Sequence, residues 1–230
     1  MTARTIVRSL LHHLPGHQQL REVAFRTGAI RWWWRYRHLI DGSYTATPVD
    51  GGAVDPHRSQ LWALIAPMAV DSLIEVGCGD GANLALFARL APRLRLSAVD
   101  LNPLALHIAE ERVRDAGGTA GEFHHSSAEQ LPVPSASADV ALSDAVFMYL
   151  PPANAVAALR EMRRVARSAL IVHTFADDTR AQSAVINGNW VHTLAKLVSV
   201  ACPGASIARQ ASSIAAGQWA EFGSIYLVTW

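Results

Sequence analysis

The stretch Leu73-Ile74-Glu75-Val76-Gly77-Cys78-Gly79-Asp80-Gly81-Ala82-Asn83 decides the fold of this chain. A short apolar run ends in a glycine-rich turn, and a segment typical of a helix follows. A second apolar run, Leu96-Ser97-Ala98-Val99, ends in Asp100, 23 residues after Gly77. This pattern is typical of a nucleotide-type cofactor site at the carboxyl edge of a parallel sheet. The acid at the end of the second strand can accept hydrogen bonds from ribose hydroxyls.

The charge of the turn separates two kinds of cofactor. The spacing Gly77-x-Gly79-x-x-Ala82 also fits a dinucleotide fingerprint, in which a pyrophosphate meets the turn and the helix N-terminus. Here Glu75 precedes the turn and Asp80 lies inside it, and two carboxylates would repel a pyrophosphate. S-adenosylmethionine has no phosphate and carries a cationic sulfonium and a cationic ammonium, which suit acidic surroundings. The turn therefore favours S-adenosylmethionine as the cofactor.

The glycine motif, followed by Ala98-Val99-Asp100-Leu101-Asn102-Pro103, resembles the class I S-adenosylmethionine-dependent methyltransferases. The resemblance covers residues 57–175 well, the tail loosely and the first fifty residues hardly at all. It implies that Asp100 binds the ribose hydroxyls and that Leu101 lies against the adenine. It further implies that the methionine part of the cofactor is surrounded by Glu75, Gly77, Gly79 and Gly81. Ser127 and Ala128 are expected to line the adenine pocket, where family members often have an acid before the alanine.

Polar residues at two further strand ends are the candidate catalytic groups. By resemblance, the segment from Leu142 to Pro151 passes under the sulfonium and faces the acceptor. Ser143 and Asp144 lie at the strand end, and Ser143 is expected to be a cofactor-binding residue. Asp144 is expected to orient the ammonium or the acceptor nucleophile, and a helix cap is the alternative. His173 is a candidate general base because imidazole titrates near neutral pH; the alternative is a hydrogen-bonded strand-end histidine. No cluster shows metal-ligand spacing, so no metal is expected.

Strands and helices alternate along the middle of the chain. The patterns predict strands near 72–76, 95–100, 120–124, 139–143 and 168–174, and helices near 57–69, 82–91, 103–116 and 153–167. Such alternation predicts parallel βαβ units with right-handed crossovers. The tail predicts a helix near 180–201 and two strands near 205–211 and 223–229, which by resemblance form a closing antiparallel hairpin. We therefore expect an α/β fold with a doubly wound, mostly parallel, seven-stranded sheet over residues 57–230.

Residues 1–56 are expected to form a separate, basic and aromatic extension. Residues 1–40 hold seven arginines and one acid, whereas the remaining residues hold 13 basic and 18 acidic side chains. One or two amphipathic helices and a glycine-rich linker over 41–56 are predicted. The three consecutive tryptophans of Arg31-Trp32-Trp33-Trp34-Arg35 cannot all face one side of a helix. Three interpretations stay open: a lid over the catalytic body, peripheral membrane contact through residues 1–40, and docking to nucleic acid.

Composition predicts a cytoplasmic protein, with membrane association left open by the extension. Half of the residues are hydrophobic, which is enough for a full core. No apolar run approaches the ~18 residues that a spanning helix needs, and the first residues lack a secretory-signal pattern because Arg4, Arg8 and two histidines interrupt them. The two cysteines, Cys78 and Cys202, give neither a disulfide framework nor a metal spacing.

Taken together, the sequence favours methyl transfer from S-adenosylmethionine to a small-molecule, sugar or lipid-linked acceptor. Oxygen is the expected atom, because Ser143-Asp144-Ala145-Val146 differs from the Asn/Asp-Pro-Pro-aromatic loop of enzymes that methylate nucleobase amino groups. Two alternatives remain, a nucleic-acid methyltransferase that docks through its basic arm and a non-catalytic S-adenosylmethionine-binding partner protein. A short-chain nicotinamide-dependent reductase is disfavoured, because the chain's one lysine, Lys196, has His192 where a Tyr-x-x-x-Lys pair requires tyrosine.

Overall fold

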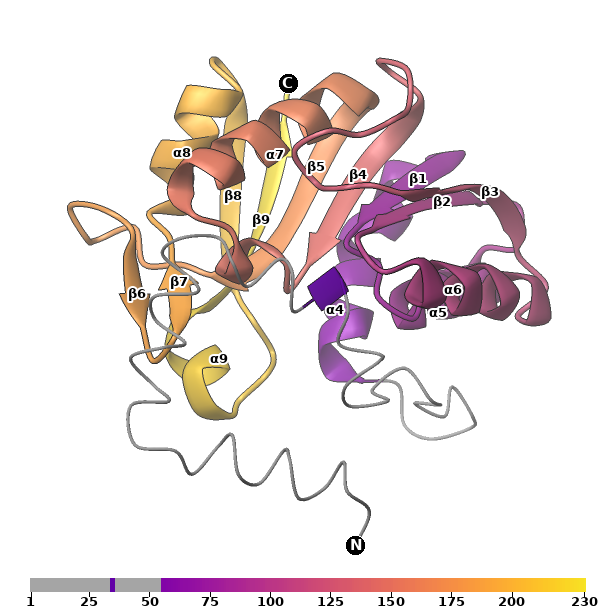
Figure 1. The fold of residues 1–230 in the computed structure, drawn as a ribbon, viewed down its shortest axis with the longest axis horizontal. Helices are drawn as coiled ribbons and strands as arrows, with labels where there is room; N and C mark the ends of the chain where they lie inside the picture. Colours follow the sequence, from indigo (N-terminus) through magenta and orange to yellow (C-terminus); the bar gives the residue numbers. More distant parts are fainter. Residues whose placement is uncertain (1–33, 36–54) are drawn as a thin grey trace, which may run out of the picture.

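The computed structural model describes residues 34–35 and 55–230 (Figure 1). The helices and the linker expected in the first 54 residues lie outside the described residues, apart from Trp34 and Arg35. The strands are β1 Ser72–Val76, β2 Arg95–Asp100, β3 Thr119–His125, β4 Ala138–Asp144, β5 Ala166–Phe175, β6 Ala184–Ile186, β7 Asn189–Val191, β8 Ser206–Ala211 and β9 Gly223–Thr229. The helices are α4 Pro56–Ile65, α5 Ala82–Leu90, α6 Pro103–Asp115, α7 Pro152–Val165, α8 Leu194–Ala201 and α9 Gly217–Phe222, with short 3₁₀ turns at Ala66–Met68 and Phe147–Tyr149.

Seven strands form one sheet in the order β3-β2-β1-β4-β5-β9-β8. The five strands from β3 to β5 are parallel, and β9 runs antiparallel to both β5 and β8. The predicted fold class, a mostly parallel seven-stranded sheet with a C-terminal antiparallel hairpin, is confirmed. The chain builds outward from β1 to β3 and then returns to place β4 on the other side of β1, so the strand order reverses between β1 and β4. Ligand sites of open α/β sheets lie at such a switch point.

The sheet is buried on both faces, which explains why its strands read as continuous apolar runs. Successive residues of β5 alternate between two hydrophobic cores: Leu170 packs on the side of α7 and α8, and Ile171 packs on the side of α4, α5 and α6. Figure 1 shows these two sets of helices on opposite sides of the sheet. The result is a three-layer α/β/α sandwich whose carboxyl edge stays accessible for polar residues.

The start of α6 shows how local sequence fixes the connection after β2. The side chain of Asn102 caps the helix by accepting hydrogen bonds from the backbone N–H groups of Leu104 and Ala105. Pro103 follows at the first helical position, where its missing N–H costs nothing. This cap starts α6 directly after β2 and leaves the carboxyl of Asp100 at the end of that strand.

The tail differs from the expected helix over 180–201. Only Leu194–Ala201 is helical, and the residues before it form the β6–β7 hairpin. Asn187 and Gly188 have φ values of +48° and +73°, the positive values that a tight two-residue hairpin turn requires. Asn-Gly between short apolar segments is a strong hairpin signal, and it outweighs the helical pattern here. The short helix α9, between β8 and β9, was also not predicted.

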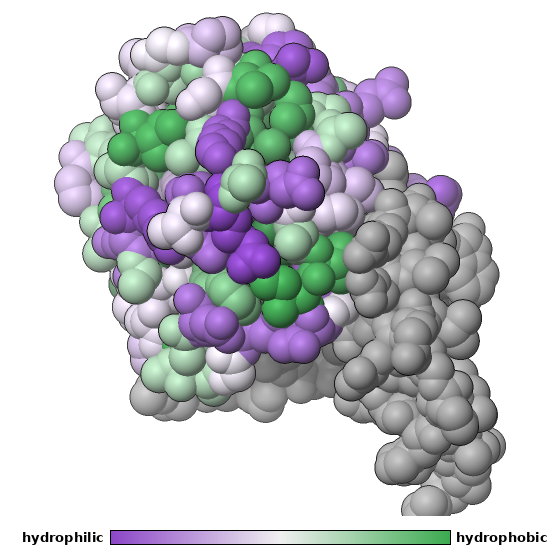
Figure 2. Space-filling view, turned by 90° about the vertical axis from the view of Figure 1, so that its left-hand side faces the viewer, coloured by the Kyte–Doolittle hydropathy of each residue, from purple (hydrophilic) through white to green (hydrophobic). Residues whose placement is uncertain are grey.

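Length and apolar character decide whether a helix can span a membrane. None of the described helices is both long and apolar enough to cross a membrane. Figure 2 shows the side that carries β6, β7 and α8, on which hydrophobic residues come in separate groups among hydrophilic ones. Several buried polar residues, among them Glu75, Ser143 and His173, lie toward the carboxyl ends of the parallel strands.

Candidate functional site

A cavity of about 370 Å³ opens at the switch point of the sheet, where β1, β2 and β4 end. Its volume falls within the range of ~300–1,000 Å³ that is typical of small-molecule sites. Among the described residues, its walls hold one basic side chain, Arg58, and five acidic ones: Glu75, Asp80, Asp100, Glu129 and Asp144. The cavity therefore favours a ligand with positive charge.

The structure brings seven of the predicted site residues to this cavity. These residues are Glu75, Gly77, Gly79, Asp100, Leu101, Ala128 and Asp144. They come from the ends of three parallel strands and from the loop after β3, so the strand order gathers residues that lie far apart in the sequence. Their roles toward a cofactor stay predictions.

Asp100 holds the glycine turn in place. Its Oδ2 accepts a hydrogen bond from the backbone N–H of Gly79 at 2.9 Å, and its Oδ1 accepts one from the N–H of Asn102 at 2.8 Å. Burial raises the pKa of Asp100, and these backbone hydrogen bonds oppose the rise. Because a carboxylate has about four acceptor positions, Asp100 can still accept hydrogen bonds from hydroxyl groups in the cavity.

Glu75 is a buried carboxyl with one open oxygen. Its side chain lies at the end of β1 with 1% of the residue exposed. Oε1 accepts a hydrogen bond from Nδ2 of Asn83 at 2.7 Å, whereas Oε2 has no hydrogen-bond partner. Burial raises the pKa of Glu75 well above its usual range. A cationic group bound in the cavity would supply the missing partner and favour the charged form.

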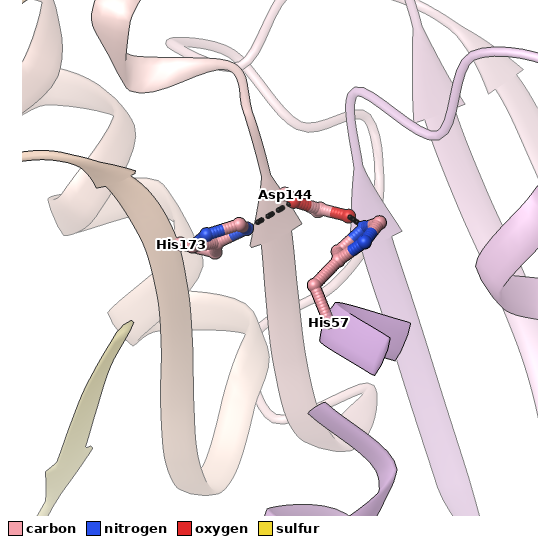
Figure 3. A group of neighbouring side chains, drawn as sticks. All are labelled: His57, Asp144 and His173. Carbon is pink, nitrogen blue, oxygen red and sulfur yellow. Dashed lines mark hydrogen bonds and ion pairs between the residues drawn. The ribbon is translucent and has the colours of Figure 1, made fainter. Parts of the chain in front are cut away.

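Asp144 has hydrogen-bond partners on both sides (Figure 3). Its Oδ1 lies 2.6 Å from Nδ1 of His173, which stands opposite Asp144 on the neighbouring strand β5. Its Oδ2 lies 3.2 Å from Nε2 of His57 and accepts from Nδ2 of Asn83 at 2.9 Å. Burial raises the pKa of Asp144, but the hydrogen bonds from His173 and His57 outweigh it, so the pKa lies well below its usual range. Asp144 is an ionised group in the cavity wall.

His173 lies behind Asp144 and is not part of the cavity wall. Its side chain is fully buried, and its Nε2 lies 2.8 Å from Oγ of Ser212. The ring packs on Trp219 at 4.4 Å between centroids. Because both ring nitrogens are engaged, the geometry favours the hydrogen-bonded strand-end histidine over the general base.

Sequence analysis missed His57, the second histidine at this site. It lies in the first turn of α4, and its Nδ1 is 2.8 Å from Oδ1 of Asp55, the N-cap of that helix. Each ring nitrogen faces a carboxylate, which can only accept, so both nitrogens donate. Burial lowers the pKa of His57, but the hydrogen bonds to Asp144 and Asp55 outweigh it, and the pKa is raised. His57 precedes Asp144 by 87 residues, so no local spacing marks it.

His57, Asp144 and His173 are also residue types that bind metals. One ligand atom from each lies within 4.8 Å of the others, a set that could hold a metal ion. No metal was predicted, because metal motifs are read from short spacings and these residues are 87 and 29 positions apart. The same three side chains are also joined by hydrogen bonds, His57 and His173 each contacting Asp144.

Trp34 and Tyr149 add an aromatic wall to the cavity. Their rings lie 4.5 Å apart between centroids, and the backbone carbonyl of Trp34 accepts from Nδ2 of Asn102 at 3.4 Å. Trp34 is thus part of the cavity wall, and the interpretation of the extension as a lid stays a prediction. Trp32 and Trp33 lie outside the described residues.

Three predicted cofactor residues occupy other positions. Gly81 is the N-cap of α5, where a Cβ atom would lie 2.6 Å from Cβ of Ala109, so it serves the packing of α5 on α6. Ser143 is fully buried and donates to the carbonyl of Val76, which ties β4 to β1. Ser127 is half-buried beside the cavity wall.

The loop after β3 supplies an acid that sequence analysis did not assign. Glu129, one residue after Ala128, lines the cavity and accepts from Nδ2 of Asn154 at 2.7 Å. The cavity wall thus contains a carboxyl group just after Ala128, although Ser127 stands before it. Sequence spacing alone could not show this, because the loop brings the later residue to the wall.

Asp80 is the one acid of the turn whose charge is balanced directly. Its Oδ2 lies 2.9 Å from Nη1 of Arg112 on α6. The repulsion of a pyrophosphate expected from Asp80 is therefore weakened. Asp144, whose pKa is lowered, is the acid of this end of the cavity that favours the charged form.

Residues 73–169 match the family model described as a methyltransferase domain. A curated relative, malonyl-[acyl-carrier protein] O-methyltransferase of Paenibacillus sp. (strain JDR-2), is 30% identical over 110 residues, which cover 46% of this chain and 40% of that protein. The chain thus spans less than half the length of this relative.

Solved structures share the fold over most of the chain. The N-methyltransferase NodS of Bradyrhizobium japonicum WM9, in complex with S-adenosyl-L-homocysteine, is similar with a TM-score of 0.62 and 18% identity, over 85% of this chain and 98% of that one. Magnesium protoporphyrin IX methyltransferase (ChlM) of Synechocystis PCC 6803, with bound S-adenosylmethionine, is similar with a TM-score of 0.58 and 17% identity, over 92% and 96%. At identities of 17% and 18%, these similarities show that the fold is shared and nothing more.

Proposed function

Because residues 73–169 belong to the methyltransferase-domain family, we propose that this chain transfers a methyl group from S-adenosylmethionine to an oxygen atom of a small-molecule acceptor. The family and the cofactor expected from the sequence are confirmed by the family match and by the structures of that fold. The observation that carries the proposal is the acid-rich cavity, in which the buried Glu75 keeps one oxygen without a partner.

The residues of the cavity fit the chemical groups of S-adenosylmethionine. Asp100 has acceptor positions left for the ribose hydroxyls, and Leu101 and Ala128 provide apolar contact for the adenine. Glu75 offers its open oxygen to the ammonium group. Arg58, the one basic side chain among the described wall residues, suits the carboxylate of the same amino-acid part. Arg58 is held by Asp55, whose Oδ2 lies 3.1 Å from its Nη1.

When bound, S-adenosylmethionine supplies a methyl group that the positive sulfur has already activated. The chain must then mainly position the acceptor and exclude water. Trp34 and Tyr149 provide an apolar wall for this purpose. Asp144, with its lowered pKa, is a poor proton acceptor, so we assign it the orientation of a charged or hydrogen-bonding group in the cavity.

The acceptor class is the least constrained part of the proposal. Oxygen is supported by the absence of a nucleobase-type loop after β4 and by the name of the curated relative, which is an O-methyltransferase. The solved neighbour NodS is named an N-methyltransferase, so the fold itself does not select the atom. Sugar or lipid-linked acceptors, and membrane contact through residues 1–40, stay proposals without further support.

Release of S-adenosylhomocysteine tests the function. The purified chain would be incubated with S-adenosylmethionine and a panel of carboxylic acids, acyl thioesters, phenols and sugars, with the variant Asp100→Ala as the inactive control. Product formation with one acceptor class, lost in the variant, supports the proposal. Cofactor binding without turnover on any acceptor would favour the non-catalytic alternative, and the absence of cofactor binding would reject both.

A further inference from the structure

The carboxylate of Asp144 is fixed by side chains from three other elements of the fold. His173 comes from β5, His57 from α4 and Asn83 from α5, and all three contact the same carboxylate. We propose that His57 and His173 are positioning residues that hold the ionised carboxylate of Asp144 toward the methyl-donor end of the cavity. This inference rests on the proposed function.

Each histidine also forms a hydrogen bond through the ring nitrogen that does not face Asp144. Nδ1 of His57 is bound to the helix cap Asp55, and Nε2 of His173 lies 2.8 Å from the hydroxyl of Ser212. The Ser212 oxygen accepts from the backbone N–H of Ile214 at 3.2 Å, so its hydrogen can be donated to His173. The carboxylate is thus the centre of a chain of hydrogen bonds that runs from Asp55 to Ser212. Such a chain fixes the ring orientations as well as the carboxylate.

Glu75 shows what the histidines contribute. Glu75 and Asp144 line the same cavity and share the donor Asn83, but no histidine among residues 55–230 forms a hydrogen bond with Glu75. Burial raises the pKa of Glu75, whereas the two histidines reverse the effect of burial at Asp144. Two neighbouring buried carboxyls resist joint ionisation. The hydrogen bonds from the two histidines are thus the feature that distinguishes Asp144 from Glu75.

The strand order places Asp144 at the charged end of the cofactor. Along the cavity edge the order is β3, β2, β1 and β4, so Asp144 lies across β1 from Asp100. With the ribose at Asp100 and the adenine near Ala128 after β3, the amino-acid part and the sulfonium extend toward β1 and β4. An anion held there faces the cationic groups of the donor.

The two ring nitrogens allow matched replacements. An asparagine amide can take the place of Nδ1 of a histidine, and a glutamine amide can take the place of Nε2. His173 uses Nδ1 toward Asp144 and His57 uses Nε2, so His173→Asn and His57→Gln keep the hydrogen bond that His173→Ala and His57→Ala remove. At His57 both replacements are uncharged, so they differ in the hydrogen bond and not in charge.

The test is the affinity of the full chain for S-adenosylmethionine, measured by calorimetry for these four variants. Each alanine variant is expected to bind at least about fivefold more weakly than its amide partner, the scale of a hydrogen bond to a charged group. In an Asp144→Asn background, His173→Ala should add less than about a twofold change, because it acts through Asp144. His107→Ala, on the exposed side of α6, is the control and should bind like the unmodified chain.

Several results would overturn the inference. Equal binding by alanine and amide variants would show that the histidines do not act through these hydrogen bonds. Full additivity with Asp144→Asn would show that His173 acts elsewhere. A stoichiometric metal ion in the purified chain, lost in both the alanine and the amide variants, would replace the hydrogen-bonded arrangement by a metal site. Failure of the unmodified chain to bind S-adenosylmethionine would instead reject the proposed function.

Discussion

Glu75 and Asp144 accept hydrogen bonds from one and the same nitrogen, Nδ2 of Asn83, at 2.7 and 2.9 Å. The two carboxyl groups share a cavity, yet burial raises the pKa of Glu75 well above its usual range, and histidine hydrogen bonds leave Asp144 with a lowered pKa. One site thus contains two carboxyl groups whose pKa values are shifted in opposite directions. Pairs of carboxyl groups whose pKa values are shifted apart are common in the active sites of enzymes.

Binding of the cationic donor should release a proton from Glu75. The charged form of Glu75 is favoured by a nearby cation, so affinity should rise as the pH rises through the raised pKa of this group, and fall at lower pH. Calorimetry in two buffers of different ionisation enthalpy measures the proton count. Glu75→Gln cannot release a proton and should remove this component; an unchanged proton count in that variant would contradict the assignment.

Asp100→Ala should weaken the binding of S-adenosylmethionine by at least about tenfold while the fold persists, because charged hydrogen bonds to the ribose and to the glycine turn are lost. Asp100→Asn keeps the shape and one acceptor oxygen, so its loss should be smaller. Calorimetry gives the affinities, and circular dichroism checks the fold. If Asp100→Ala bound the cofactor as tightly as the unmodified chain, the ribose assignment would be wrong.

Gly79→Ala and Gly81→Ala should separate binding from stability. At Gly81 a Cβ atom would meet Cβ and Cα of Ala109 at 2.6 and 2.7 Å, so the variant should lose about 3 kcal/mol of unfolding free energy. At Gly79 a Cβ has open space, and the cost should be the backbone strain at φ +52°, about 1 kcal/mol. Urea denaturation measures both. Gly79→Ala, on the cavity wall, should instead reduce cofactor affinity more than Gly81→Ala does.

Trp34→Ala should weaken cofactor binding several-fold, because the ring forms part of the cavity wall and packs on Tyr149. Trp34→Phe keeps an aromatic face and is expected to bind more tightly than the alanine variant. Calorimetry on the full chain measures the difference. Identical affinities for the unmodified chain and both variants would mean that the extension does not close this cavity.

The sequence alone predicted the main strands and helices and the position of Asp100, but not all of the side chains around Asp144. The apolar runs, the glycine turn and the Asn102-Pro103 cap are local signals, and they correctly placed β1, β2, α5 and α6 and the carboxyl of Asp100. His57 and Asn83 carry no such signal. They belong to the site because the fold brings α4 and the start of α5 against the end of β4, a contact that no spacing in the sequence records.

The secondary structure of the tail was harder to predict, because a helical pattern and a hairpin-turn signal occur in the same segment. The apolar residues of 180–201 suggest a helix, but Asn187 and Gly188 adopt the positive φ values of a hairpin turn and divide the segment. Ser212 became part of the network only through the same tail, where the loop after β8 passes behind His173. The position of His173 at the end of a strand was therefore predicted correctly, whereas its contact with Ser212 was not.

A third, small hydrophobic cluster lies apart from the two cores on either side of the sheet. Its buried members are Met148, Phe175, Val191 and Phe222. Ala145 and Tyr149 pack against this cluster and also line the cavity. Substitutions in the cluster would therefore be transmitted to the cavity wall through these two residues.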